Sequence, residues 1–115
     1  MRMNTDGATH LVRQLDAGSF DGCIRSGIVL VDFGERYCGP CQMQSAVLER
    51  LATRIGSQVT LAEVDVDMAP DVAARFHVES IPTLLLFKDG QLRRQFVGVQ
   101  REARLAKVIH EVATE

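Results

Sequence analysis

The feature that most constrains the fold of this chain is the segment Cys38-Gly39-Pro40-Cys41, together with its neighbours in sequence. Before it, residues 28–33 form a nearly continuous aliphatic run, which is typical of a strand covered on both faces. After it, apolar residues recur at helical spacing over residues 43–55, and Gly56 is a predicted helix stop. The cysteines therefore stand between a buried strand, which should be central in a sheet, and a packed helix.

A pair of cysteines at the start of a helix is suited to redox chemistry. Unpaired amide groups and the dipole of the helix N-terminus lower the pKa of the first thiol, Cys38, so that it can react as a thiolate near neutral pH. Cys38 can then attack a disulfide, and Cys41 can attack Cys38 to release the product. Gly39 keeps the approach to Cys38 open, and Pro40 fixes φ without losing an amide bond in the first turn. A rigid turn with two inert cysteines is the alternative, and a zinc site would need two further ligands.

Composition narrows the class of protein. A chain of 115 residues, 46% of them hydrophobic, can bury a core without structural disulfides, so its three cysteines need another explanation. The formal net charge of −2 and the lack of a basic block argue against nucleic acid as a partner. The first residues are polar and lead into no apolar run of signal-peptide length, which predicts a cytoplasmic protein with no membrane partner.

The order of the remaining elements predicts an α/β fold. Residues 10–15 are expected to form a weak edge strand, and a short helix should begin at Ser19. The strand expected at residues 59–66 should pair in parallel with residues 28–33, because a helix connects the two. A second short helix is expected from Pro70.

The last third of the chain adds an antiparallel pair and a terminal helix. Asp89-Gly90 stands between two strand-like runs, which is a strong signal for a tight hairpin. Apolar residues over 105–112 share one helical face, so a helix should pack on the sheet. Since no linker divides the chain, we expect one domain over residues 1–115, with residues 1–8 as a flexible tail.

In this order and at this spacing, the chain resembles the thioredoxin family over residues 20–112. The motifs that carry the resemblance are Val31-Asp32-Phe33, Cys38-Gly39-Pro40-Cys41, Val64-Asp65-Val66-Asp67, Ile81-Pro82-Thr83-Leu84-Leu85-Leu86-Phe87-Lys88-Asp89-Gly90 and Val97-Gly98. The resemblance implies a thioredoxin fold, with a central mixed sheet flanked by helices on both faces. It also implies a protein-disulfide reductase, recharged by thioredoxin reductase or a similar electron donor. We expect a monomer that requires no cofactor.

The resemblance assigns roles to individual residues. Cys38 is the exposed nucleophile and Cys41 the buried resolving thiol. The bond before Pro82 is cis, although trans would be the default for an X-Pro bond. Tyr37, Ile81 and Gly98 would then border the place where a substrate chain docks beside Cys38.

Asp32 is the second chemically significant residue. An unpaired charge inside the aliphatic run would cost several kcal/mol, so burial should raise its pKa. In the family the matching acid is thought to take the Cys41 proton through water. An acid that points to solvent at the strand end is the alternative.

Several residues depart from the family pattern. Glu63 stands where thioredoxins usually carry a lysine that faces the buried acid, and strand alternation allows it to approach Asp32. Two such acids cannot both ionise cheaply, which predicts one protonated acid at neutral pH and slow resolution of mixed disulfides. A Glu63 turned outward into water is the alternative. Gln42 replaces a lysine, so together with Glu63 it should raise the pKa of the Cys38 thiol. Gly34 replaces an aromatic residue and should leave a gap or a more flexible wall.

Alternatives to the reductase are an oxidant or isomerase with altered redox properties, and a binding module whose chemistry is weakened by Tyr37, Gly34 and Glu63. Cys23 is expected to be a packing or surface residue, with regulation through its thiol as the alternative. The three histidines are scattered in sequence, which argues against a metal site. They are His10, His77 and His110.

Overall fold

The computed structural model describes residues 11–115, in which five strands form a mixed sheet in the order β2-β4-β3-β5-β6. The strands are β2 (Val12–Leu15), β3 (Ile28–Gly34), β4 (Thr60–Asp65), β5 (Thr83–Lys88) and β6 (Gln91–Val97). The β4 strand is parallel to both β2 and β3, while β5 is antiparallel to β3 and β6. The predictions of a central strand, a parallel pair, an edge strand and a hairpin are confirmed.

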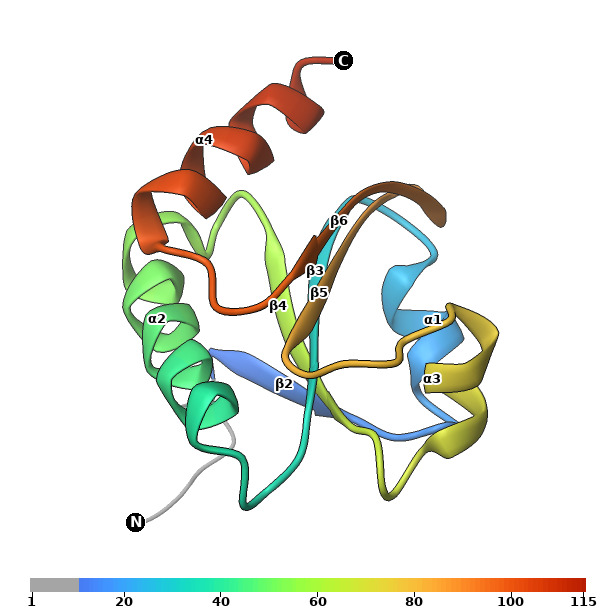
Figure 1. Ribbon diagram of the computed structural model, residues 1–115. Coiled ribbons are helices and arrows are strands. Elements are labelled where there is room, and N and C mark those ends of the chain that lie inside the picture. Colours follow the sequence, from blue (N-terminus) through green and yellow to red (C-terminus); the bar gives the residue numbers. More distant parts are fainter. Residues whose placement is uncertain (1–10) are drawn as a thin grey trace, which may run out of the picture.

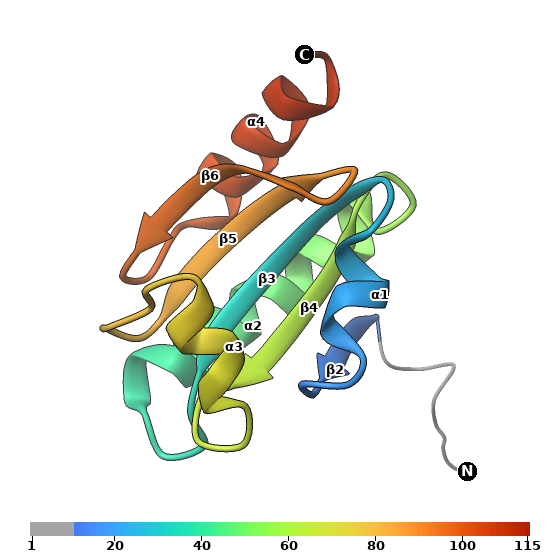
Figure 2. The ribbon, with the colours of Figure 1, turned by 90° about the vertical axis from the view of Figure 1, so that its right-hand side faces the viewer.

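Helices cover both faces of this sheet (Figures 1 and 2). On one face lie α2 (Gly39–Ile55) and α4 (Glu102–Ala113), and on the other lie the short helices α1 (Phe20–Ile24) and α3 (Pro70–Arg75). Each pair packs on its own apolar core, one centred on Leu48 and Leu84 and the other on four phenylalanine rings. The layered α/β architecture is therefore as expected.

The β3 strand faces both cores at once. Val31 and Phe33 point to the α1 and α3 side, whereas Leu30 belongs to the core under α2 and α4. Since side chains alternate along a strand, Asp32 points to the same side as Leu30. The one acid of this strand is therefore directed toward the helix that carries the two cysteines.

Some predicted boundaries differ from the observed ones. The α2 helix begins at Gly39, so Pro40 and Cys41 lie in its first turn, and β4 is shorter by one residue at each end than expected. Gly56 ends α2 with a right-handed backbone (φ −61°) rather than the left-handed one that usually selects glycine. The predicted tail over residues 1–8 and the strand start at His10 lie outside the described residues.

The start of α1 is held by a different group from the one predicted. Ser19 occupies the N-cap position, but its side chain makes no capping hydrogen bond. Instead the Asp16 carboxylate accepts the Ser19 amide at 2.9 Å, and the Asp16 amide donates to the Ser19 hydroxyl at 3.0 Å. The helix entry is thus fixed one turn earlier than the sequence pattern indicates.

The turn of the β5–β6 hairpin is hydrogen-bonded to the loop before β3. Asp89 and Gly90 both have positive φ, 50° and 85°, as a tight two-residue turn requires. The Asp89 amide donates to the Gly27 carbonyl at 2.9 Å, and the Gly27 amide donates to the Asp89 carboxylate at 2.8 Å. This reciprocal pair explains why a non-glycine residue is held in the left-handed region here.

Gly90→Ala should destabilise the protein by about 1 kcal/mol, because a Cβ at positive φ is strained even where space is free. At Gly90 the nearest atoms to such a Cβ are 3.7 Å away, so steric overlap adds little. Gly22→Ala is the matched control, since Gly22 lies in α1 and no atom lies within 4 Å of a Cβ built on it. This substitution should raise the free energy of unfolding by about 0.5–1 kcal/mol. Urea unfolding measures both, and equal effects of the two substitutions would contradict the assigned turn.

Candidate active site

The cysteines, Pro82 and Gly98 meet at one end of the sheet because of strand register. Phe33, near the end of β3, pairs with Thr83 at the start of β5, and Thr83 pairs with Val97 at the end of β6. The segments that continue from these three positions carry Cys38, Pro82 and Gly98. The Gly98 amide donates to the Pro82 carbonyl at 2.8 Å, which joins two of the three segments directly.

Cys38 and Cys41 form a disulfide across the first turn of α2. Cys38 is the N-cap residue, with extended backbone, and the Cys41 amide donates to its sulfur at 3.1 Å. The Cys38 residue is half-buried, while Cys41 is only 5% exposed. A reaction partner therefore reaches the Cys38 sulfur more easily than the Cys41 sulfur, and an amide stands ready to stabilise charge on Cys38.

Gly34 does not leave the gap that its sequence position suggested. A Cβ built on Gly34 would lie 3.1 Å from both the Cβ and the sulfur of Cys41, which is tighter than ordinary contact. The side chain of Cys41 thus occupies the space beside the β3 terminus. Glycine at position 34 allows this close approach, so the expectation of a gap is wrong.

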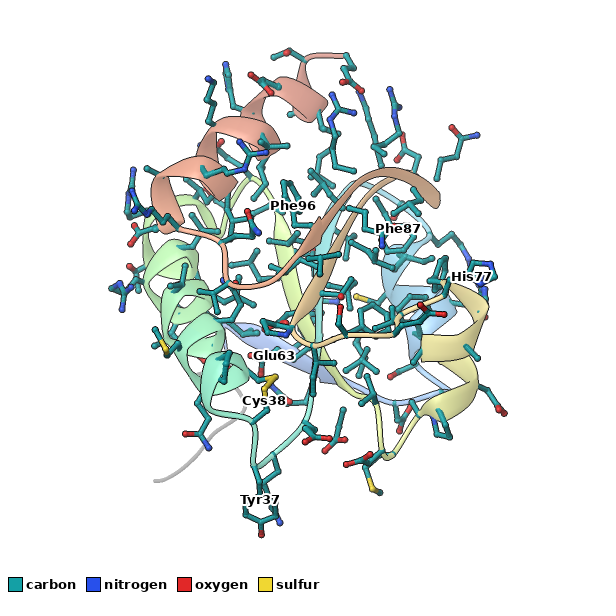
Figure 3. The ribbon with its side chains drawn as sticks, in the orientation of Figure 1. Tyr37, Cys38, Glu63, His77, Phe87 and Phe96 are labelled. Atoms are coloured by element: carbon teal, nitrogen blue, oxygen red, sulfur yellow. A yellow bond between two sulfur atoms is a disulfide. The ribbon has the colours of Figure 1, made fainter. Side chains whose placement is uncertain are left out.

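Asp32 and Glu63 lie side by side on neighbouring parallel strands. They are paired in register across β3 and β4, so both side chains point to the α2 side of the sheet. Together with Cys41 and Ser45 they line a cleft of about 310 Å³ that opens beside the dithiol. Asp32 is only 3% exposed, and Glu63 is half-buried in the cleft (Figure 3). The alternatives in which either acid points away into water are wrong.

The carboxylate of Glu63 is held by two donors. The Gln14 side-chain amide donates to Oε1 at 2.7 Å, and the Ser45 hydroxyl donates to Oε2 at 2.5 Å. Gln14 comes from the edge strand β2, in register with Glu63, and Ser45 comes from α2. A row of three polar side chains thus crosses the parallel strands, from Gln14 through Glu63 to Asp32.

The environment of Asp32 favours its protonated form. Burial, and then the neighbouring charge of Glu63, raise the pKa of Asp32 from 3.8 to about 8. Its Oδ1 atom is buried and forms no hydrogen bond with any residue of the described chain. At neutral pH Asp32 therefore holds a proton in the cleft that Cys41 also lines, which agrees with the predicted protonated acid.

The remaining predicted site residues lie around the dithiol at different depths. The peptide bond between Ile81 and Pro82 is cis, as the resemblance implied, and Gly98 has a positive φ of 88°. Ile81 is half-buried, whereas Tyr37 is 86% exposed and points away from the body of the protein (Figure 3). Gln42 donates to the Arg36 carbonyl at 3.1 Å and so closes the loop that leads to Cys38.

Residues outside the site take ordinary positions. Cys23 is half-buried against the core under α1 and α3, as expected for a packing residue. His77 and His110 are both exposed, and His10 lies outside the described residues. Within residues 11–115 no cluster of three potential metal ligands occurs. In the same part of the chain no helix is long and apolar enough to cross a membrane.

Three side chains that form hydrogen bonds at or near the site were not predicted from the sequence: Gln14, Gln44 and Ser45. A signal for Gln44 did exist, because it falls on the α2 face that also carries Leu48 and Leu51. The apolar spacing that starts at Met43 predicts that Met43 belongs to this face, and the structure corrects this, since Met43 is 63% exposed and Gln44 is fully buried. A polar residue within an apolar helical stripe is the pattern that could have revealed it.

Comparison with known proteins agrees with this architecture. The sequence model of the family described as Thioredoxin matches residues 11–111. A thioredoxin of Staphylococcus saprophyticus is 46% identical over 93 residues, which cover 81% of this chain and 89% of that protein. A thioredoxin of Staphylococcus aureus is 44% identical over 99 residues, 86% of this chain and 94% of that protein.

Solved structures give the same answer. A mutant thioredoxin from Halobacterium salinarum aligns with a TM-score of 0.83 at 33% identity, covering 97% of each chain. Chloroplastic thioredoxin z also aligns with a TM-score of 0.83, over 90% of this chain and 96% of its own, and at 21% identity it supports the fold alone.

The Cys38–Cys41 disulfide joins a half-buried and a buried cysteine where a central strand leads into a helix, and this arrangement defines a thiol–disulfide oxidoreductase. The chain belongs to the thioredoxin family, whose members are protein-disulfide oxidoreductases. The predicted family, fold class and general activity are confirmed.

The stability of the oxidised protein should fall as pH rises from about 4 to about 8. In this range folded Asp32 keeps a proton that the unfolded chain has lost, because its folded pKa is about 8 and its ordinary value is 3.8. The free energy of unfolding then decreases by up to about 1.4 kcal/mol per pH unit.

Asp32→Asn should flatten this slope and leave the variant more stable than the parent at pH 8, by an amount on the order of a few kcal/mol. Urea unfolding at several pH values, with the disulfide intact, measures the effect. Asp67→Asn, which changes an exposed acid, is the control and should keep the slope of the parent. Parallel pH curves for Asp32→Asn and the parent would contradict the assigned pKa.

Proposed function

We propose that the protein reduces disulfide bonds of other proteins, with Cys38 as the nucleophile and Cys41 as the resolving thiol. The observation that carries the proposal is the unequal exposure of two cysteine residues already joined by a disulfide at a helix N-terminus. In the reduced protein the Cys38 thiolate attacks one sulfur of the substrate disulfide and releases the other as a thiolate. Deprotonated Cys41 then attacks Cys38, which frees the second substrate sulfur. Two electrons pass to the substrate, and the dithiol becomes the disulfide.

Asp32 is proposed to exchange the proton of Cys41, since both side chains line the same cleft. A carboxyl group with a pKa of about 8 is ionised in only about a tenth of molecules at neutral pH, so few are ready to accept that proton. Glu63 tunes this step by placing a second negative charge beside Asp32. Resolution of the mixed disulfide should therefore be slow at pH 7 and should accelerate toward pH 9.

Substrate docking is proposed at the end of the sheet that carries Cys38. Tyr37, Ile81 and Gly98 would contact an extended substrate chain, with Gly39, Pro40 and Pro82 shaping the approach. The chain would act as one domain and as a monomer in the cytoplasm, with no cofactor besides its dithiol. A flavoenzyme of the thioredoxin reductase type would return the two electrons. Family membership supports these assignments.

Reduction of insulin disulfides, driven by NADPH and a thioredoxin reductase, should depend on both active-site cysteines. Cys38→Ser should abolish turnover, because no nucleophile remains. Cys41→Ser should also stop turnover and should accumulate a mixed disulfide between Cys38 and the substrate, visible by mass spectrometry. Cys23→Ser is the control and should retain the parent rate. Turnover that survives Cys38→Ser would refute the assigned nucleophile.

Glu63→Lys should shift the pH dependence of resolution to lower pH, because a positive charge beside Asp32 favours its carboxylate. Glu63→Gln should produce a smaller shift in the same direction. Stopped-flow measurement of the second step of disulfide exchange, from about pH 5 to about pH 9, tests both variants. Glu49→Lys makes the same charge change on the exposed side of α2 and serves as the control. An unchanged pH profile in Glu63→Lys would rule out the tuning role.

A further inference from the structure

Gln44 is a fully buried polar side chain on α2, one turn beyond Cys41. The disulfide exchange described above makes no use of it. A buried side-chain amide without hydrogen bonds would destabilise the folded protein, so the hydrogen-bond partners of Gln44 indicate its role. They lie not on the helix but in the segment that follows β6.

The amide of Gln44 pairs with the backbone of Gln100 in both directions. Its Oε1 accepts the Gln100 amide at 2.6 Å, and its Nε2 donates to the Gln100 carbonyl at 3.1 Å. This is the double exchange that two residues of antiparallel strands make. Residues 98–101 belong to no helix or strand. The Gln44 side chain therefore provides the backbone of Gln100 with the hydrogen bonds that a neighbouring strand would otherwise make.

The hydrogen bonds continue from Gln100 to the loop that carries Pro82. The Gln100 side chain donates to the Gly98 carbonyl at 3.1 Å, and the Gly98 amide donates to the Pro82 carbonyl at 2.8 Å. The helix that bears the dithiol is thereby connected to both loops at the same end of the sheet. Gln44 is the α2 residue that makes the first hydrogen bonds of this series.

The segment held in this way presents apolar surface next to the site. Val97 is 60% exposed and Val99 is 40% exposed, on either side of Gly98. Two exposed valines on a backbone of fixed position suit an extended polypeptide, which can pair its own backbone and bury alternate side chains. A small disulfide without a polypeptide backbone would gain little from them.

We propose that Gln44 is a positioning residue that holds residues 97–100 ready to receive the extended polypeptide around a substrate disulfide. The assignment rests on the proposed reduction of protein disulfides and adds a buried residue that orders the part of the proposed docking surface around Gly98. Gln44 affects the affinity for the substrate polypeptide, whereas Cys38 and Cys41 carry out the disulfide exchange. Fixing the segment before binding lowers the entropy cost of docking.

Gln44→Leu removes both hydrogen bonds to Gln100 at nearly constant volume. The KM for a protein disulfide should rise about tenfold with little change in kcat, since two hydrogen bonds of ordinary strength order the segment. The rate constant for a small symmetrical disulfide without peptide bonds, bis(2-hydroxyethyl) disulfide, should stay within about twofold of the parent. Gln44→Glu keeps only the acceptor for the Gln100 amide and should give an intermediate KM.

Hydrogen exchange supplies a readout that does not depend on substrate. The amides of Gln100 and Gly98 should exchange about tenfold faster in Gln44→Leu, while those of the β5–β6 ladder keep their protection. Gln58→Leu makes the same chemical change at an exposed glutamine in the loop before β4 and should leave all of these quantities unchanged. If Gln44→Leu does not fold, Gln44→Glu serves for both measurements.

Three results would overturn the inference: an unchanged KM in a folded variant, unchanged exchange at Gln100, or an equal loss of rate with the protein and the small disulfide. The parent protein, assayed in parallel, separates this test from that of the proposed function. An inactive parent would refute protein-disulfide reduction and the inference that rests on it. An active parent with unaffected variants would refute the role of Gln44 alone.

Discussion

The structure depends on the burial of β3 between two layers of helices and two neighbouring strands. Such a strand has no polar face, so its single acid must be either neutral or paired. Alternation along the strand directs Asp32 toward α2, and Cys41 of α2 lies close to Gly34 at the end of the same strand. The position of β3 in the sheet thus places a buried carboxyl group and a buried cysteine in one cleft.

The residues around Asp32 differ from the usual family pattern. Where relatives of the family usually place a lysine, this chain places Glu63, and the edge strand and α2 supply Gln14 and Ser45 to hold its carboxylate. A cation would lower the cost of a charge on Asp32, whereas a second acid raises it. The cleft therefore keeps Asp32 protonated at neutral pH, while Cys38 is half-buried at the helix N-terminus.

Much of the fold could be predicted because local patterns agree with tertiary structure. The aliphatic run of β3, the Asp89-Gly90 turn and the spacing of the cysteines each have one favoured structure. The cis bond at Pro82 came only from the family resemblance, since the local sequence favours trans. The partners of Glu63 could not be predicted, because the register of β2 brings Gln14 from a distant part of the chain. Gln44 was missed because the helical stripe was centred one residue too early.

The most direct test of the account is the reduction potential of the Cys38–Cys41 pair, measured in a Cys23→Ser background. Equilibration with dithiothreitol and glutathione buffers, followed by alkylation and mass spectrometry, gives the value. If the protein reduces protein disulfides, we expect a reduction potential of about −270 mV, at the thioredoxin end of the range of dithiol proteins. A potential of about −180 mV or higher, in the range of isomerases and oxidants, or failure of the pair to form a disulfide at all, would contradict it.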